Sequence, residues 1–153
     1  MSQRKDIASN KKARHEFHIL ETFEAGIELR GTEVKSVRAG RINLRDSFAR
    51  VDKGQIWLHG CDIQQYERAS YEQHEAKRAR RLLLHKKEIL KLNGYTAEKG
   101  RTLVALRAYW KDQLVKIELG VARGKMQADK REDIKKRDQD REACRAMTSF
   151  NRR

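Results

Sequence analysis

The chain has 153 residues, the size of one domain, and carries 36 Lys and Arg against 22 Asp and Glu, a formal net charge of +14. A charge this positive favours a polyanionic partner, either nucleic acid or an anionic membrane surface, over an acidic-patch binder or a typical small-molecule enzyme. No run of about 18 apolar residues is present, which argues against a membrane-spanning helix.

Composition divides the chain into a polar, basic N-terminal segment (1–15), a region with nearly all the large apolar side chains (16–122) and a charged tail (123–153). In the middle region apolar residues recur with period two, which is typical of half-buried strands. The expected strands lie near 17–23, 27–29, 46–52, 56–60, 103–109 and 114–121, with hairpin turns at 52–54 and 111–113.

Two short helices interrupt the predicted strands. Thr32 can cap a helix over 32–39 that ends before Gly40, and apolar residues over 82–93 predict a second helix ended by Gly94. About six short strands with two to three short helices indicate a mainly β, OB-like small barrel, because closure removes exposed strand edges. The basic tail has little apolar area, so we expect it to be disordered when free and helical along an RNA groove.

The basic segment before the first predicted strand places charged side chains at a barrel rim. Lysine and arginine can contact phosphates there, and asparagine or histidine can hydrogen-bond to bases or stack on them. The RNA-binding residues expected in this segment are Asn10, Lys11, Lys12, Arg14 and His15. An ordinary solvated terminus is the alternative.

Glu24 lies beside Gly26, between two predicted strands. In an RNA site its carboxylate could accept hydrogen bonds from a guanine base or orient a neighbouring arginine. A turn followed by a capped surface helix is the alternative explanation of this segment.

A second basic run surrounds three consecutive leucines at 82–84. Residues 68–87 hold seven Lys or Arg against two Glu, and the leucines would anchor these cations on a packed element. We therefore expect an RNA-facing surface that includes Arg81, His85, Lys86 and Lys87. A flexible solvated loop is the alternative for residues 64–80.

Other chemistry has little support in the sequence. Cys61 and Cys144 have no partner at CxxC or metal-ligand spacing, and the N-terminal residues lack the apolar stretch of a secretory signal, so we expect free thiols, no metal and a cytoplasmic protein. The five histidines form no HxxxH or HExxH pattern, and each is expected to be buried or stacked. No phosphate loop or dinucleotide fingerprint occurs, so we expect no enzyme and no cofactor.

A family resemblance rests on five motifs in a fixed order: NKKARHEF, FEAGIELRGTEVKSVRAGRINLRDSFA, LLLHKKEI, TLVALRAYWK and ARGK…DKRE…KKRD. Together they resemble the SsrA-binding protein (SmpB) family from Asn10 through the tail. The resemblance implies an OB-like barrel with helices that binds transfer-messenger RNA and brings it to ribosomes stalled on defective messages. It also implies no cofactor and no catalysis.

The resemblance implies contacts with the tRNA-like domain at Asn10, Glu24 and Leu83, and phosphate contacts from Lys11, Arg14 and Lys86. In this picture the barrel stands in for an anticodon arm. The tail occupies the empty mRNA channel near the small-subunit decoding centre, and the protein acts as a monomer away from membranes.

The tail motif of the family is glycine, two lysines, two variable residues and then Asp-Lys-Arg. Here the second lysine is Met126 and the residue before the aspartate is Ala128, so no stacking contact is expected from position 128. The expected ribosome-binding residues are Lys125, Asp129, Lys130, Arg131, Arg137 and Arg141. A solubilising charged helix is the alternative for this segment.

Two other functions stay open at this point. A general single-strand RNA chaperone would need rows of aromatic residues on one barrel face, whereas aromatic residues are only 7% of this chain and scattered along it. A structural ribosomal protein is the second alternative. The RNA that co-purifies with the protein distinguishes all three.

Overall fold

A computed structural model describes residues 3–65, 74–98, 100–124 and 127–151, with backbone alone for 127–130 and 149–151. The chain divides into two compact units, Met1–Arg123 and Gly124–Arg153. The elements in order are β1 (Arg4–Ser9), α1 (Lys11–Glu16), β2 (Phe17–Ile27), α2 (Gly31–Arg38), β3 (Ile42–Asn43), β4 (Phe48–Asp52), β5 (Gln55–His59), β6 (Asp62–Ile63), β7 (Arg80–Leu83), α3 (Lys86–Ala97), β8 (Arg101–Lys111), β9 (Leu114–Gly124) and α4 (Gln127–Asn151).

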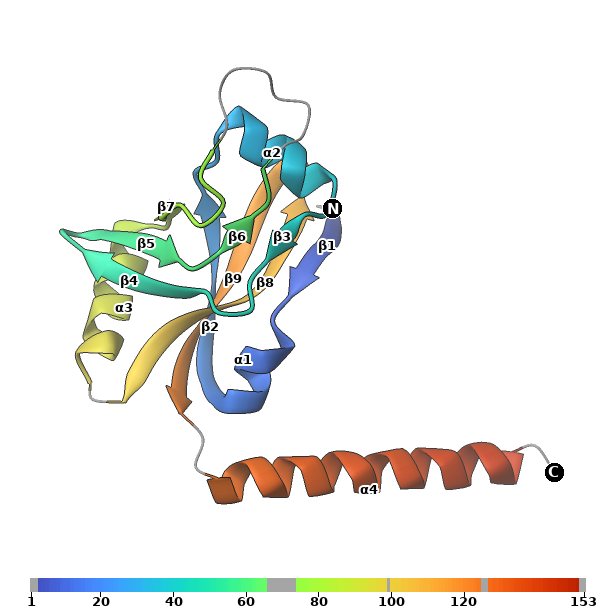
Figure 1. Ribbon diagram of the computed structural model, residues 1–153. Coiled ribbons are helices and arrows are strands. Elements are labelled where there is room, and N and C mark those ends of the chain that lie inside the picture. Colours follow the sequence, from blue (N-terminus) through green and yellow to red (C-terminus); the bar gives the residue numbers. More distant parts are fainter. Residues whose placement is uncertain (1–2, 66–73, 99, 125–126, 152–153) are drawn as a thin grey trace. The chain divides into compact units, whose positions relative to one another are not determined.

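The first unit is built on a sheet that closes on itself (Figure 1). The strand order is β1-β8-β4-β5-β7-β2-β9, and β8 also pairs with β9, so six strands form a ring to which β1 adds at β8. Strand β8 joins two neighbours on one edge, because its first residues pair with β4 and its later residues pair with β1. The prediction of a mainly β fold of about six strands with short helices is confirmed.

The core lies inside the ring. Alternate residues of β5, β8 and β9 point inward and are fully buried, as Ile56, Leu103 and Ile117 illustrate. Helix α3 adds Leu92 to this core. Both predicted hairpins are present, and Lys53 and Asp112 adopt the left-handed φ values, 50° and 56°, that tight hairpin turns require.

Two strands differ from those expected. Gly26 does not end a strand: β2 runs unbroken from Phe17 to Ile27, and Gly26 pairs with Leu83. A Cβ on Gly26 would lie 3.3 Å from the Cβ of Leu83, so the missing side chain allows this close approach. The leucine run begins as strand β7 rather than as a helix, because β7 fills the gap between β5 and β2.

The helix limits also differ. Helix α3 begins at Lys86 and continues through Gly94 to Ala97. Helix α2 begins at Gly31, with Arg30 at the N-cap position, so Thr32 lies inside the helix rather than at its cap. Gly40 does follow the end of α2 with a φ of 75°, a conformation that favours glycine.

The N-terminal residues contribute two elements that the sequence did not predict. Strand β1 pairs antiparallel with the second half of β8, and α1 follows it directly. Both therefore belong to the first compact unit. No helix in the described part of the chain is long and apolar enough to cross a bilayer.

Candidate nucleic-acid interface

Three residues that the sequence singled out line one surface hollow of about 490 Å³. Glu24 comes from β2, Leu83 from the end of β7, and His85 from the position before α3. The remaining lining residues are Leu84, Glu88 and Lys116. The pairing of β2 with β7 brings these distant segments together, because Gly26 lies directly opposite Leu83.

Glu24 is held in place by three neighbours. Its Oε1 accepts a hydrogen bond from Lys111 Nζ at 2.9 Å, and its Oε2 accepts from the Tyr109 hydroxyl and from Arg4 Nη2 at 3.4 Å. The hydrogen bonds from Tyr109 and Lys111 hold the pKa of Glu24 below its ordinary value. The carboxylate is therefore ionised at neutral pH, and with 30% of its side chain exposed it can still reach a ligand.

Tyr109, which donates to Glu24, is buried in the fold with only 2% of the residue exposed. Burial, together with its hydrogen bond to Glu24, raises the pKa of Tyr109 to about 12, so its hydroxyl remains a donor. The guanidinium groups of Arg4 and Arg107 lie 5.3 Å and 5.1 Å from the centre of its ring. Sequence reasoning missed this support. The available signal was the spacing of Arg107, Tyr109 and Lys111, which alternate along one strand and therefore share one face of it.

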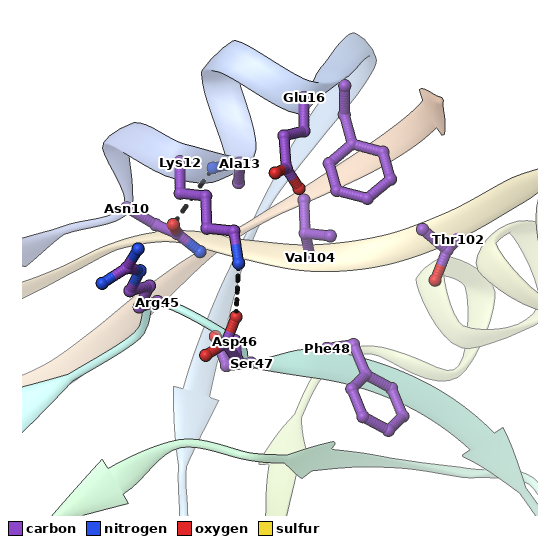
Figure 2. Close-up of a pocket in the computed structure, with 11 residues that line it drawn as sticks. Asn10, Lys12, Ala13, Glu16, Arg45, Asp46, Ser47, Phe48, Thr102 and Val104 are labelled. Atoms are coloured by element: carbon purple, nitrogen blue, oxygen red, sulfur yellow. Dashed lines mark hydrogen bonds and ion pairs between the residues drawn. The ribbon is translucent and has the colours of Figure 1, made fainter. Parts of the chain in front are cut away.

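A second surface surrounds α1 (Figure 2). Lys12 forms a 2.9 Å ion pair with Asp46 beside a hollow of about 230 Å³ that Arg45 also lines. Lys11 and Arg14 are exposed, with Arg14 Nη2 lying 3.8 Å from Glu118, and His15 is half-buried. This surface thus gathers most of the cations expected from the N-terminal segment.

Asn10 differs from its neighbours because it faces the interior and is only 3% exposed. Its Oδ1 accepts a hydrogen bond from the Ala13 backbone, which caps α1. Its Nδ2 donates to the carbonyls of Leu44 and Ala105, at 2.8 Å and 2.9 Å. All these bonds are internal, so Asn10 fixes the start of α1 and does not offer its amide to a base.

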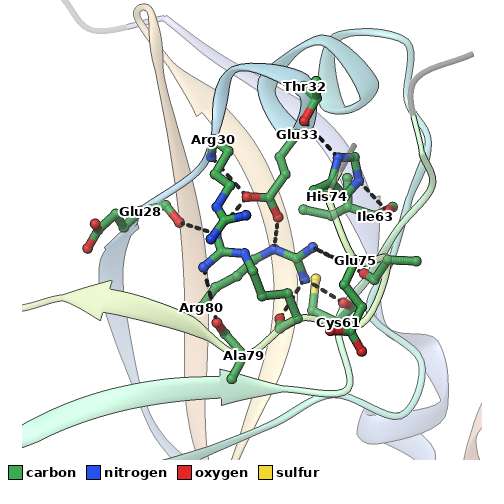
Figure 3. Close-up of polar contacts among 12 residues, drawn as sticks. Glu28, Arg30, Thr32, Glu33, Cys61, Ile63, His74, Glu75, Ala79 and Arg80 are labelled. Carbon is green, nitrogen blue, oxygen red and sulfur yellow. Dashed lines mark hydrogen bonds and ion pairs between the residues drawn. The ribbon is translucent and has the colours of Figure 1, made fainter. Parts of the chain in front are cut away.

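The basic run before the leucines is only partly on the surface. Arg80 is fully buried and donates to the buried carboxylate of Glu33 and to the carbonyl of Cys61 (Figure 3). Arg78 Nη2 donates to the other oxygen of Glu33 at 2.6 Å. Burial would raise the pKa of Glu33, but the hydrogen bonds from Arg78, the Arg30 backbone and Arg80 outweigh it and hold the pKa below its ordinary value.

These two arginines therefore tie α2 to the start of β7 and the residues just before it instead of facing RNA. The other residues expected from this run do lie at the surface: His85, Lys86 and Lys87 are exposed, and Arg81 is ion-paired with Glu28 at 2.9 Å. The sequence left a flexible solvated loop over residues 64–80 as the alternative. Residues 66–73 of this segment lie outside the described residues, and its last residue, Arg80, belongs to β7.

The histidines and cysteines agree in part with the sequence. His74 is buried, and His59 stacks on Phe48 with a centroid distance of 5.3 Å, as expected, but the prediction was wrong for the exposed His85. Cys61 and Cys144 are free thiols, which confirms that prediction. Within the described residues, no group of three or more His, Cys, Asp or Glu could hold a metal ion.

The structure also gathers aromatic side chains that are scattered in the sequence. Phe48 and His59 are paired across β4 and β5, and Trp57 lies two residues from His59 on the same face. Arg50 and Arg81 pair with Trp57 in register from the two neighbouring strands. Sequence reasoning missed this group because only strand pairing brings it together.

In the tail, α4 spans Gln127–Asn151. Arg131, Arg137 and Arg141 are exposed on it. Asp129 and Lys130 lie in its first turns by their backbone, and Lys125 lies outside the described residues. Disorder of the tail in the free protein remains a prediction.

A strand ring with exposed cations beside its hollows and a basic tail is typical of a nucleic-acid-binding protein. The family model described as SmpB protein matches residues 7–149. The chain therefore belongs to the SmpB family.

Relatives cover nearly the whole chain. An SsrA-binding protein of Carboxydothermus hydrogenoformans is 56% identical over 143 residues, which are 94% of this chain and 96% of the relative. One of Geobacillus thermodenitrificans is 55% identical over 94% of this chain and 92% of its own. A chain of the solved structure described as "tmRNA-SmpB: a journey to the center of the bacterial ribosome" matches with a TM-score of 0.67 and 45% identity, over 83% of this chain and 93% of that chain.

Proposed function

We propose that this protein binds transfer-messenger RNA and brings it to stalled ribosomes for trans-translation. Its membership of the SmpB family and its relatives described as SsrA-binding proteins support this proposal. The observation that carries it is the meeting of Glu24, Leu83 and His85, from separate parts of the sequence, at one hollow.

The chemistry of this hollow suits folded RNA. Lys116 lines the hollow and can contact a phosphate there, while Lys111 is paired with Glu24. Glu24 stays ionised and can accept hydrogen bonds from a guanine base. Leu83 is 49% exposed and offers an apolar contact for a ribose or a base.

The surface around α1 extends this interface. We propose phosphate contacts from Lys11, Lys12 and Arg14, and a base contact from His15. Asn10 supports them by capping α1, since its own amide is used within the fold. From the second basic run we propose contacts by Arg81, His85, Lys86 and Lys87.

The tail supplies the ribosome contact. A helix of the length of α4, 25 residues, spans about 37 Å at 1.5 Å per residue, which suits an empty mRNA channel. We propose that the tail is disordered in the free protein and folds there. Its ribosome-binding residues are Lys125, Asp129, Lys130, Arg131, Arg137 and Arg141.

In this proposal the ring stands in for an anticodon arm, and the protein works by binding alone, as a monomer, without catalysis or a cofactor. Because its partner is the ribosome, it acts in the cytoplasm.

The test is to purify the tagged protein from cells and sequence the RNA that accompanies it. One structured RNA, transfer-messenger RNA, is expected. Many unrelated RNAs would favour a general RNA chaperone, and ribosomal RNA alone would favour a structural ribosomal protein. The Glu24→Ala variant should lose the structured RNA, while the control surface variant Arg38→Gln on α2 should keep it.

A further inference from the structure

We propose that the outer face of β4, β5 and β7 is a stacking platform for unpaired RNA bases, formed by Phe48, Trp57 and His59 with Arg50 and Arg81. This platform is a binding surface beyond the proposed function, and Arg81 is the one residue that it shares with the interface proposed there. It takes single-stranded RNA, and it does not depend on which folded RNA the hollow at Glu24 binds.

Strand register places these side chains on one face. Phe48 pairs with His59, and Arg50 pairs with Trp57, so each pair projects to the same side of β4 and β5. Trp57 also pairs with Arg81 of β7. The residues between them, such as Ala49, point inward and are buried, so the platform faces outward.

The rings are arranged for stacking. The Phe48 and His59 rings lie 5.3 Å apart at an interplanar angle of 21°, and Phe48 is 40% exposed. The guanidinium of Arg50 lies 6.0 Å from the centre of the Phe48 ring. Exposed aromatic rings with arginine beside them bind unpaired bases through their π faces, with little dependence on sequence.

A hollow of about 580 Å³ adjoins the platform, with Trp57 in its wall. The side chain of Arg81 is fixed at this hollow by Glu28 at 2.9 Å and by Gln55 at 3.1 Å. A fixed guanidinium plane is itself a surface on which a base can stack. The hollow thus offers room for a base beside the Trp57 ring and the held arginine.

The local charges favour bases over a continuous phosphate track. Arg50, Lys53 and Arg81 are balanced in part by Glu28 and Asp52. Stacking is therefore the main attraction, and the overall charge of +14 adds long-range attraction for a polyanion such as RNA. Single strands fit best, because the bases of a duplex already stack on one another.

Trp57 provides a direct signal of stacking. The chain has two tryptophans, so the Trp110→Phe variant leaves Trp57 as the single tryptophan, whose emission is excited selectively over that of the tyrosines. Titration with oligoadenylate RNA of about 12 nucleotides should quench its fluorescence to saturation. In the complementary variant Trp57→Phe, the same titration should leave the emission of Trp110 nearly unchanged.

Two exposed positions test the platform without touching the core. Phe48→Leu and Arg50→Gln should each weaken oligoadenylate binding by about tenfold, as loss of one stacking contact predicts. Arg38→Gln makes the same charge change on α2 and should weaken it by less than about twofold. Glu24→Ala, which tests the proposed function with transfer-messenger RNA, should leave oligoadenylate binding unchanged.

Several results would overturn the platform. These are absence of Trp57 quenching, equal weakening by Arg50→Gln and Arg38→Gln, or binding of an RNA hairpin as tightly as the single strand. Quenching by an acidic peptide with none by RNA would assign the face to a protein partner instead. Circular dichroism establishes that each variant is folded, and Phe48→Leu and Arg50→Gln decide the matter if a tryptophan variant does not fold.

Discussion

The buried hydroxyl of Tyr109 donates a hydrogen bond to Glu24, the carboxylate that we propose as an RNA contact. This bond and the 2.9 Å bond from Lys111 engage different oxygens of the carboxylate. Tyr109 and Lys111 of β8 therefore fix the orientation of Glu24 in the protein without RNA.

Replacing Tyr109 by phenylalanine should weaken binding of transfer-messenger RNA, because Glu24 loses the donor that fixes it. The ring and its two arginine neighbours remain, so we expect the free energy of unfolding to fall by only about 1 kcal/mol. Filter binding and urea unfolding measure the two effects.

A double-mutant cycle separates positioning from packing. If Tyr109 acts through Glu24, the double variant Glu24→Ala/Tyr109→Phe should bind RNA no more weakly than Glu24→Ala alone. Additive losses would show that Tyr109 affects binding by another route.

Neutralising Lys86 should weaken RNA binding and reduce its salt dependence. Lys86 is exposed in the first turn of α3, next to the hollow at Glu24. Loss of one phosphate contact should lower the slope of log K against log salt by about 0.9. Arg38→Gln is the matched control. If Lys86→Gln and the wild type show the same slope of log K against log salt, Lys86 does not contact a phosphate in the interface.

Acid should destabilise the fold in part through Glu33. Its pKa in the folded protein lies below the ordinary value of 4.5, so its ionised form stabilises the fold above about pH 4.5 and this stabilisation is lost as the pH falls through the folded pKa. Glu33→Gln should cost about 3–5 kcal/mol at pH 7, since it leaves the buried charge of Arg80 without its ionic partner.

Urea unfolding between pH 3 and 7 measures this dependence. The Glu33→Gln variant should show a shallower loss of stability below pH 4.5 than the wild type. Glu98→Gln, which removes an exposed carboxylate paired with Arg101, should change stability at pH 7 by less than about 1 kcal/mol.

The two free thiols should differ in reactivity. Cys144 is exposed, whereas Cys61 is fully buried and burial raises its pKa to about 12. A thiol reagent at pH 8 should therefore modify one cysteine rapidly in the native protein and both after unfolding. Rapid modification of Cys61 in the native protein would contradict its burial.

Truncation after Gly124 should separate RNA capture from ribosome function. The removed residues 125–153 hold ten Lys or Arg and six Asp or Glu, a net charge of +4, so most of the +14 remains. The first unit forms its own core, and we expect near-normal stability and transfer-messenger RNA binding from it.

The same truncation should abolish peptide tagging in a reconstituted translation assay, because no helix enters the mRNA channel. Circular dichroism of the full chain should show a gain of helix from the tail only with ribosomes or a helix-promoting solvent. Normal tagging by the truncated protein would reduce the tail to a solubilising extension.

Much of the fold could be predicted from local pattern. Alternation of apolar residues marked most strands, and the residues around Lys53 and Asp112 marked both hairpins, because these features depend on near neighbours in the chain. The same local rules misassigned Gly26 and the leucines at 82–84. Pairing of β2 with β7 decides both, and pairing is a long-range property.

The site shows the same division. The sequence by itself determined which residue types were available: a basic composition, a carboxylate at Glu24 and two cationic runs. Only the tertiary structure decided which of them face outward. It buries Asn10 and Arg80 in internal hydrogen bonds, and it supports Glu24 from Tyr109, 85 positions away.

The aromatic platform is the clearest example. Phe48, Trp57 and His59 are ordinary strand residues in the sequence, and Arg81 lies far along the chain in a different basic run. A side chain's face depends on the period of its own strand, but its neighbours depend on the register between strands. Register follows from burying one apolar face of every strand in a common core, and that requires the whole ring.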